Sequence, residues 1–116
     1  MIYEQSSLYQ RAHQISVQAI RCSQMLPTGE RYGARSQVSR AAMSVVSNLA
    51  EGWTRKSWSE RRHFLAIAHG SLAELDAQLK LCVDVGWLDR NQLSETFKEI
   101  DEVNRILYTI RARIRT

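Results

Sequence analysis

Proline, glycine and cysteine are scarce in this chain of 116 residues, and each scarcity excludes a class of structure. A single proline (Pro27), five glycines and no Asn-Gly or Asp-Gly pair provide too few turn signals for an all-β fold. No uninterrupted apolar run approaches the roughly 18 residues that a membrane-spanning helix needs. The composition therefore predicts a single helical domain outside the membrane.

Cysteine and histidine are too few and too scattered to predict a metal site or a cofactor. Cys22 and Cys82 lack a CxxC motif and fall on predicted apolar helix faces, so we predict two reduced thiols in the core. A disulfide between them is the open alternative. Because the first residues lack a basic segment followed by an apolar one, we expect no secretory signal and a cytoplasmic location.

Apolar residues recur every three or four positions in four segments, which predicts four amphipathic helices. The helices are expected at about residues 4–25, 33–52, 58–85 and 90–114. Short connections between them predict an all-α, up-down-up-down four-helix bundle, with one domain covering residues 1–116. The expected caps are Gly52 and Gly86 at helix C-termini, and Ser57 (with Glu60 in a capping box) and Asp89 at helix N-termini.

The stretch from residue 40 to residue 52 is built from small side chains and has two faces. An apolar seam contains Val38, Ala42, Val45 and Leu49, and a polar stripe beside it contains Arg40, Ser44, Ser47 and Glu51. Small residues allow another helix to approach closely. We therefore predict an inner helix whose polar stripe is satisfied by its neighbours.

Charge is distributed unevenly along the chain, although the formal total is only +4. Residues 31–63 contain seven Arg or Lys and two acids, which gives +5, whereas residues 84–102 contain two bases and six acids, which gives −4. Residues 105–116 add four arginines and no acid. This asymmetry suits either an anionic partner or a contact between copies of the chain.

The segment from Arg55 to His63 interleaves cations with aromatic residues. Its cations could hold phosphates while Trp53 or Trp58 stacks on a base. The alternative is a solvated helix start whose tryptophans pack at a subunit contact. Cations at a helix N-terminus oppose the macrodipole, which favours their retention for a partner. The candidate phosphate contacts are Arg55, Lys56, Arg61, Arg62, Arg111, Arg113 and Arg115.

A second group of polar residues follows the two central helices. Its members are Arg40, Ser44, Asn48, Glu51, Ser71, Glu74 and Gln78. A carboxylate near a serine could do acid–base work, but no histidine lies within hydrogen-bonding reach of Ser71 on its helix. We therefore predict no enzyme activity. The group is expected to form a structural polar core or a subunit contact, with Glu51 and Glu74 paired to Arg40 or capping the backbone.

Two blocks of residues form a specific combination. The first comprises Tyr32-Gly33, Ser36-Gln37, Arg40-Ala41, Ser44 and Ser47-Asn48-Leu49-Ala50-Glu51-Gly52. The second comprises Glu60, Phe64-Leu65, Ile67-Ala68, Gly70-Ser71-Leu72, Glu74-Leu75, Gln78-Leu79 and Gly86-Trp87-Leu88. In this order they resemble the 23S rRNA-intervening-sequence proteins, which are small bacterial four-helix bundle proteins. The fold also resembles the accessory variability protein of diversity-generating retroelements. The resemblance implies a ring, expected to be a homopentamer, with nucleic acid and a protein as partners.

Together these observations predict a non-enzymatic protein that self-assembles into a ring and binds structured RNA or DNA through a basic surface, as an adaptor to another protein. The alternative is a structural or protein-interaction scaffold without nucleic-acid affinity. In that case an acidic partner, or the acidic segment of a neighbouring copy, would take up the basic stretch. The two hypotheses differ in whether the arginines face outward on the assembled protein.

Overall fold

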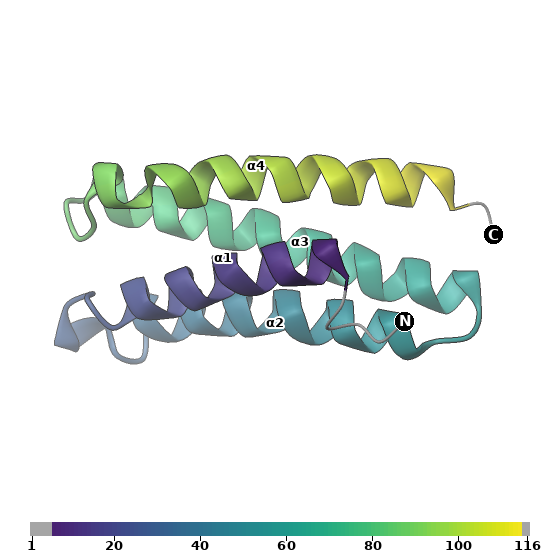
Figure 1. The fold of residues 1–116 in the computed structure, drawn as a ribbon. Helices are drawn as coiled ribbons and strands as arrows, with labels where there is room; N and C mark the ends of the chain where they lie inside the picture. The colour runs from purple at the N-terminus through teal and green to yellow at the C-terminus, as the bar shows by residue number, and fades with distance from the viewer. Residues whose placement is uncertain (1–5, 115–116) are drawn as a thin grey trace.

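Four α-helices make up most of residues 6–114, the part of the chain that the computed structural model describes (Figure 1). They are α1 (Ser7–Ser23), α2 (Ala34–Thr54), α3 (Trp58–Asp84) and α4 (Arg90–Arg113), with a short 3₁₀ turn, η2 (Thr28–Glu30), between the first two. The predicted helices agree with these bounds to within about two residues, except that the predicted start at residue 4 lies outside the described residues. The all-α class is confirmed.

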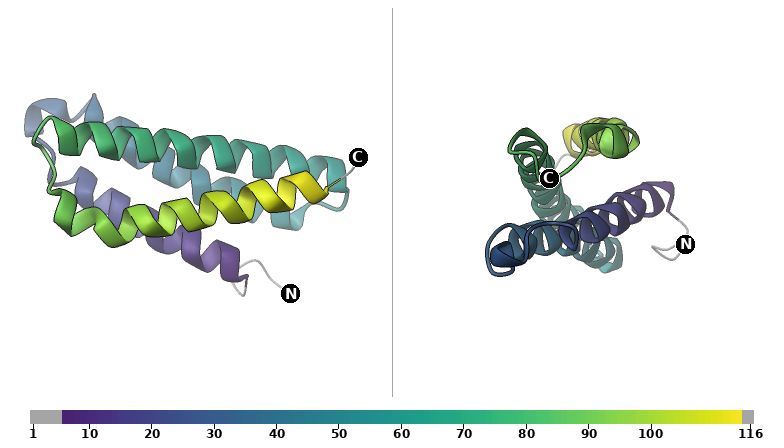
Figure 2. Two further views of the ribbon diagram at one scale, coloured as in Figure 1. Left: turned by 90° about the horizontal axis from the view of Figure 1, so that it is seen from above. Right: turned by 90° about the vertical axis from the view of Figure 1, so that its left-hand side faces the viewer.

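The two ends of the bundle are built from different connections (Figure 1). The α1–α2 and α3–α4 turns lie at one end, and the α2–α3 connection lies at the other, beside the start of α1 and the end of α4. The molecule measures 43 × 25 × 22 Å along its principal axes. The most extensive packing is between α2 and α3, followed by α1 and α2. The two orthogonal views in Figure 2 show the helices tilted relative to one another.

The predicted apolar seams meet in one hydrophobic core. The seam of α2 is confirmed, because Val38, Ala42, Val45 and Leu49 are all buried. On α3, Leu72, Leu75 and Leu79 are fully inaccessible to solvent, and α4 contributes a matching row from Leu93 to Leu107. Residues spaced three and four apart lie on the same side of a helix, so burying them together is what fixes the rotation of each helix.

Most of the predicted caps are confirmed. The Ser57 hydroxyl accepts a hydrogen bond from the Glu60 amide at 3.1 Å, and the Asp89 carboxylate accepts one from the Asn91 amide at 2.9 Å. Gly86 ends α3 with a φ of +87°, a conformation that residues with a side chain rarely adopt. The Trp87 amide then reaches back to the Cys82 carbonyl at 2.9 Å, which completes a Schellman motif.

The prediction that Gly52 caps α2 is wrong. The helix continues to Thr54, and Gly52 is buried against α3. A Cβ at this position would lie 3.1 Å from the Cβ of Phe64 and 3.7 Å from the carbonyl oxygen of Arg61. Gly52 is therefore a point at which the backbone of α2 approaches α3 closely, and the absence of a side chain there permits this packing.

The cysteines are both free, as predicted. Cys82 is buried and Cys22 is half-buried, and burial raises the pKa of both thiols. Within residues 6–114, no helix is long and apolar enough to span a bilayer. In the same range no three side chains of His, Cys, Asp or Glu gather in a way that could hold a metal ion.

Candidate nucleic-acid interface

The fold brings most of the predicted phosphate contacts to one end of the bundle. Four come from the α2–α3 connection and the first turns of α3, and two come from the last turns of α4, about 50 residues further along the chain (Figure 1). We call this surface the basic end; it comprises Arg55, Lys56, Arg61, Arg62, Arg111 and Arg113. The seventh candidate, Arg115, lies outside the described residues.

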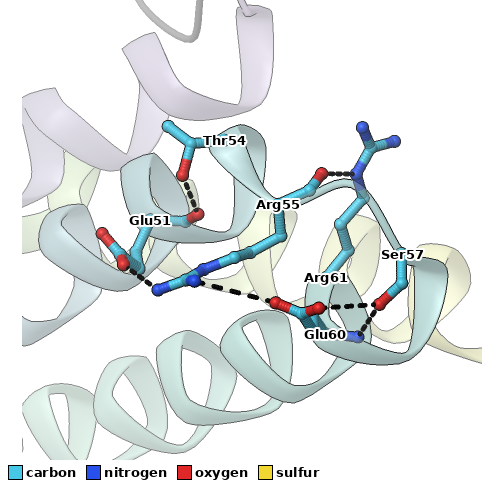
Figure 3. Close-up of polar contacts among 6 residues, drawn as sticks. All are labelled: Glu51, Thr54, Arg55, Ser57, Glu60 and Arg61. Atoms are coloured by element: carbon cyan, nitrogen blue, oxygen red, sulfur yellow. Dashed lines mark hydrogen bonds and ion pairs between the residues drawn. The ribbon is translucent and has the colours of Figure 1, made fainter.

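Arg55 is held by two carboxylates of its own chain. Its guanidinium forms ion pairs with Glu51, one helical turn earlier, and with Glu60 at 3.7 Å (Figure 3). It also lies over the ring of Phe64, with its central carbon 4.9 Å from the ring centroid. Because two acids neutralise its charge, Arg55 is poorly suited to be a free phosphate contact.

Arg61 is anchored to the same connection (Figure 3). Its Nε donates a hydrogen bond to the carbonyl oxygen of Arg55 at 2.7 Å. Its guanidinium carbon lies 4.9 Å from the centroid of the Trp58 ring, a distance at which a cation is attracted to an aromatic face. The terminal nitrogens of Arg61 point away from the carboxylates of Glu51 and Glu60. Arg61 therefore orders Trp58 and keeps part of its donor capacity.

Three cations of the basic end are unengaged. Lys56, Arg62 and Arg113 are exposed, and none of them forms an ion pair or side-chain hydrogen bond with any residue from 6 to 114. Exposed cations without a partner on the chain are the groups that neutralise phosphates at least cost, since no internal contact has to be broken. They are the strongest phosphate-binding candidates.

Arg111 faces α3 more than solvent. Its Nη1 lies 3.0 Å from the Nδ1 of His69, and its Nε is buried without a hydrogen-bond partner among the described residues. Burial, and secondarily the charge of Arg111, lowers the pKa of His69. A neutral imidazole can accept a hydrogen bond from the guanidinium, whereas a protonated one would repel it.

This contact predicts how stability responds to pH. Because the pKa of His69 is lower in the folded chain than its ordinary value of 6.5, the unfolded chain binds the proton first as pH falls. The free energy of unfolding should therefore decline as pH drops from 7 towards 5. Urea melts at several pH values should show a smaller decline for His69→Gln. The exposed His63 on the same helix supplies the control, because His63→Gln should leave the decline as in the wild type.

The Glu99 carboxylate does not contribute to the decline between pH 7 and 5. The ion pair between Arg11 of α1 and Glu99 of α4 lowers the pKa of Glu99 below its ordinary value of 4.5. Its contribution to stability is therefore present above that value and is lost only in more acidic solution. An identical decline between pH 7 and 5 in wild type and His69→Gln would contradict the assignment to His69.

Two hollows open beside the basic residues. The first has a volume of about 320 Å³ and is lined by residues from all four helices. Its lining is mostly apolar and consists of Ser6, Leu8, Tyr9, Leu49, Gly52, Trp53, Trp58, Arg61, Leu65, Ile110 and Ile114. The second, of about 440 Å³, is lined by Trp58, Ile110, Arg113 and Ile114. Trp58 thus borders both hollows, and 60% of its surface is exposed to solvent.

The second group of predicted residues divides into separate pairs and clusters. The hydroxyls of Ser44 on α2 and Ser71 on α3 lie 2.6 Å apart, and the Asn48 amide donates to the Ser44 hydroxyl at 3.1 Å. On the surface of α3, Gln78 donates to Glu74 at 3.1 Å. The small cluster of two serines and an asparagine therefore satisfies its polar groups locally, at the contact between the two helices.

The expected pairing of Arg40 with Glu51 or Glu74 is wrong for the described chain. Arg40 is exposed, Glu51 pairs with Arg55, and Glu74 accepts from Gln78. In a single copy, α2 is therefore not an inner helix: Arg40, Ser47 and Glu51 of its polar stripe are exposed, whereas Ser44 contacts α3. It borders a groove of about 550 Å³ lined by Gln37, Ser39, Arg40, Ala41, Met43, Ser44, Ser47, Ser71 and Glu74.

Comparison with known proteins settles which family this chain is from. The family model described as 23S rRNA-intervening sequence protein matches residues 4–109, which is nearly the whole chain. The chain belongs to the 23S rRNA-intervening sequence protein family. The resemblance to this family seen in the sequence is thereby confirmed.

A solved structure has the same fold as this 23S rRNA-intervening sequence protein. It is the crystal structure of a protein of unknown function from the S23 ribosomal protein family of Bacteroides thetaiotaomicron. The two chains are 19% identical and superpose with a TM-score of 0.81, over 90% of this chain and 95% of the other. At that identity the likeness shows the fold. A search of curated proteins gave no match.

Sequence reasoning missed the apolar part of the site in this 23S rRNA-intervening sequence protein. Ile110 and Ile114 belong to the apolar periodicity of the helix predicted at residues 90–114, yet they also line both hollows. The available signal was their position, since the seam of α4 extends to the last turn of the bundle. Tyr9 gave no such signal, because its place in the lining depends on how α1 lies across α2.

Proposed function

We propose that this protein is a non-enzymatic, cytoplasmic RNA-binding adaptor whose up-down-up-down bundles assemble into a ring. What supports RNA binding most directly is one observation. Segments about 50 residues apart place three unengaged cations, Lys56, Arg62 and Arg113, around an exposed tryptophan at one end of the molecule. Cations hold the phosphate backbone, and an exposed aromatic ring beside them offers contacts to bases.

Self-assembly is proposed because apolar side chains remain on the outer surface. Met43 on α2 is 55% exposed, Ile67 and Leu81 on α3 are 38% and 63% exposed, and Val85, directly after α3, is 52% exposed. Apolar surface of this kind is typical of contacts between copies. A ring would also repeat the basic end around one axis, which multiplies the phosphate contacts available to a single RNA. Five copies is the number we propose, and light scattering should give five times the chain mass of 13.4 kDa.

The decisive test of RNA binding removes the unengaged cations. The triple variant Lys56→Ala, Arg62→Ala and Arg113→Ala should bind a structured RNA on the order of tenfold more weakly at about 0.1 M salt, and the affinity should depend less steeply on salt. Each phosphate contact that is lost releases one fewer counterion, which is why the slope changes. Gel shifts or filter binding at several salt concentrations would measure both effects.

A matched control changes the total charge equally at other places. Arg21, Arg31 and Lys98 are exposed and lie away from the basic end, so replacing all three with alanine should have a smaller effect on both affinity and slope. If the two triple variants behave alike, binding is not localised at the basic end. If the wild type binds no RNA at low salt, the scaffold hypothesis takes the place of this proposal.

A further inference from the structure

We propose that Trp58 is a stacking platform for an unstacked RNA base, and that the hollow between Trp58, Ile110, Ile114 and Arg113 receives that base. The inference rests on the proposed RNA-binding function and specifies the kind of RNA that is bound. The partner is a helical RNA interrupted by a bulged or looped-out nucleotide, and an uninterrupted duplex is the poorer ligand.

Exposing the Trp58 side chain to water is unfavourable in free energy, and Trp58 is not part of the core of the described chain. The residue is 60% exposed in the first turn of α3, a position where any polar residue would serve the helix equally well. Indole is the largest apolar side-chain surface, and leaving it in water forgoes the gain from burial. An aromatic ring with both a cation and an open hollow beside it is the arrangement used to stack nucleobases.

The ring is held in place before any ligand arrives. The guanidinium of Arg61 lies over Trp58 with its carbon 4.9 Å from the ring centroid, and Arg61 is fixed by its hydrogen bond to the Arg55 carbonyl (Figure 3). The Arg55 side chain is in turn held by Glu51 and Glu60. Arg55 and Arg61 are therefore positioning residues. A side chain that is already ordered loses less entropy on binding.

The second hollow lies beside a part of Trp58 that Arg61 leaves open, because Arg61 is not among the residues lining it. Ile110 and Ile114 supply apolar walls, and Arg113 supplies a cation within the lining itself. A ligand for this hollow needs a flat apolar part joined closely to an anion. A nucleotide has both, and the neighbouring cations Lys56 and Arg62 can hold the phosphates on either side of it.

Three RNA hairpins of one sequence provide the test: an uninterrupted stem, the same stem with one bulged adenosine, and the same stem with an abasic bulge. The abasic hairpin keeps the bend and the phosphate but removes the stacking surface. We expect the wild type to bind the adenosine bulge about tenfold more tightly than the abasic bulge, which is the size of one base–aromatic stack. Adenosine is chosen because stacking tolerates any base and a purine has the larger face.

Variants at Trp58 test whether the preference for the adenosine bulge comes from stacking on its ring. Trp58→Ala should reduce the ratio of the two affinities to near one while binding the uninterrupted stem as the wild type does, and Trp58→Phe should keep most of the preference. Arg61→Ala should reduce the ratio as well. Trp87→Ala is the matched control and should leave the ratio unchanged. Trp87 is 39% exposed and belongs to the α3–α4 turn, which lies at the opposite end of the bundle.

Several results would overturn the inference. A wild-type ratio near one, or a ratio that Trp58→Ala does not change, rejects the stacking platform while leaving RNA binding through the basic end intact. Loss of the assembled mass in light scattering for Trp58→Ala, with the ratio retained, assigns Trp58 to a subunit contact. Absence of binding to all three hairpins rejects both this inference and the proposed function.

Discussion

Replacing Leu75 with alanine should lower the free energy of unfolding by about 2–5 kcal/mol. Leu75 is fully inaccessible to solvent at the middle of α3, within the core that all four helices share. Truncation removes apolar contacts and leaves a cavity that the surrounding helices fill only in part. A loss of this size is a large fraction of the stability of an ordinary small domain. Urea unfolding followed by circular dichroism would measure it.

Leu81→Ala, six residues further along α3, is the control for Leu75→Ala. Leu81 lies on α3 as well, but its side chain is 63% exposed. Leu81→Ala should change the free energy of unfolding of the single chain by less than about 0.5 kcal/mol, because nothing in the core depends on it. Equal effects at Leu75 and Leu81 would mean that the buried face of α3 has been assigned wrongly. A large effect at Leu81 that depends on protein concentration would instead place it in a contact between copies.

Gly52→Leu is expected to destabilise the fold by about 1–3 kcal/mol or more. Even a single Cβ would lie 3.1 Å from the Cβ of Phe64, so a leucine side chain must push α2 away from α3. The displacement would begin next to Arg55 and Arg61, and RNA binding at the basic end should weaken together with stability. Thermal melts and the hairpin-binding assay would record both changes.

Gly70 provides the comparison for this substitution. It lies within α3, is exposed, and a Cβ there would meet nothing within 4 Å. Gly70→Ala should therefore stabilise the chain by about 0.5–1 kcal/mol, since alanine favours helix where glycine does not. If Gly52→Leu were as well tolerated as Gly70→Ala, the close approach of α2 and α3 at Gly52 would be refuted.

The helices and the core could be predicted because their signals are local. Spacing of three and four residues marks the buried side of a helix whatever it packs against, so the seam of α2 could be predicted without any knowledge of its partners. The caps at Ser57, Asp89 and Gly86 depend on neighbouring residues only. Gly52 was misjudged because a glycine near a helix end fits both a cap and a close contact, and only the position of Phe64 distinguishes them.

The candidate site was predicted less completely, because its geometry depends on contacts between distant segments. The sequence singled out basic residues, most of which the fold gathers at one end of the bundle, but it treated them as equivalent. The fold separates Arg55, which two acids neutralise, from Lys56, which is unengaged one residue later. It also turns Arg111 towards His69 while Arg113 remains exposed. The spacing of four residues between Glu51 and Arg55 is a local signal for an ion pair. The orientation of Arg111, by contrast, follows from how α4 lies against α3.

The position of Ser6 and Ile114 has a practical consequence. These two residues, near the start and the end of the chain, line the same hollow at the basic end. An affinity tag or fluorescent fusion joined to either terminus is therefore tethered beside the surface under test, and a histidine tag would add imidazoles there. Labels attached in the α3–α4 turn, at the opposite end of the 43 Å molecule, leave that surface unobstructed.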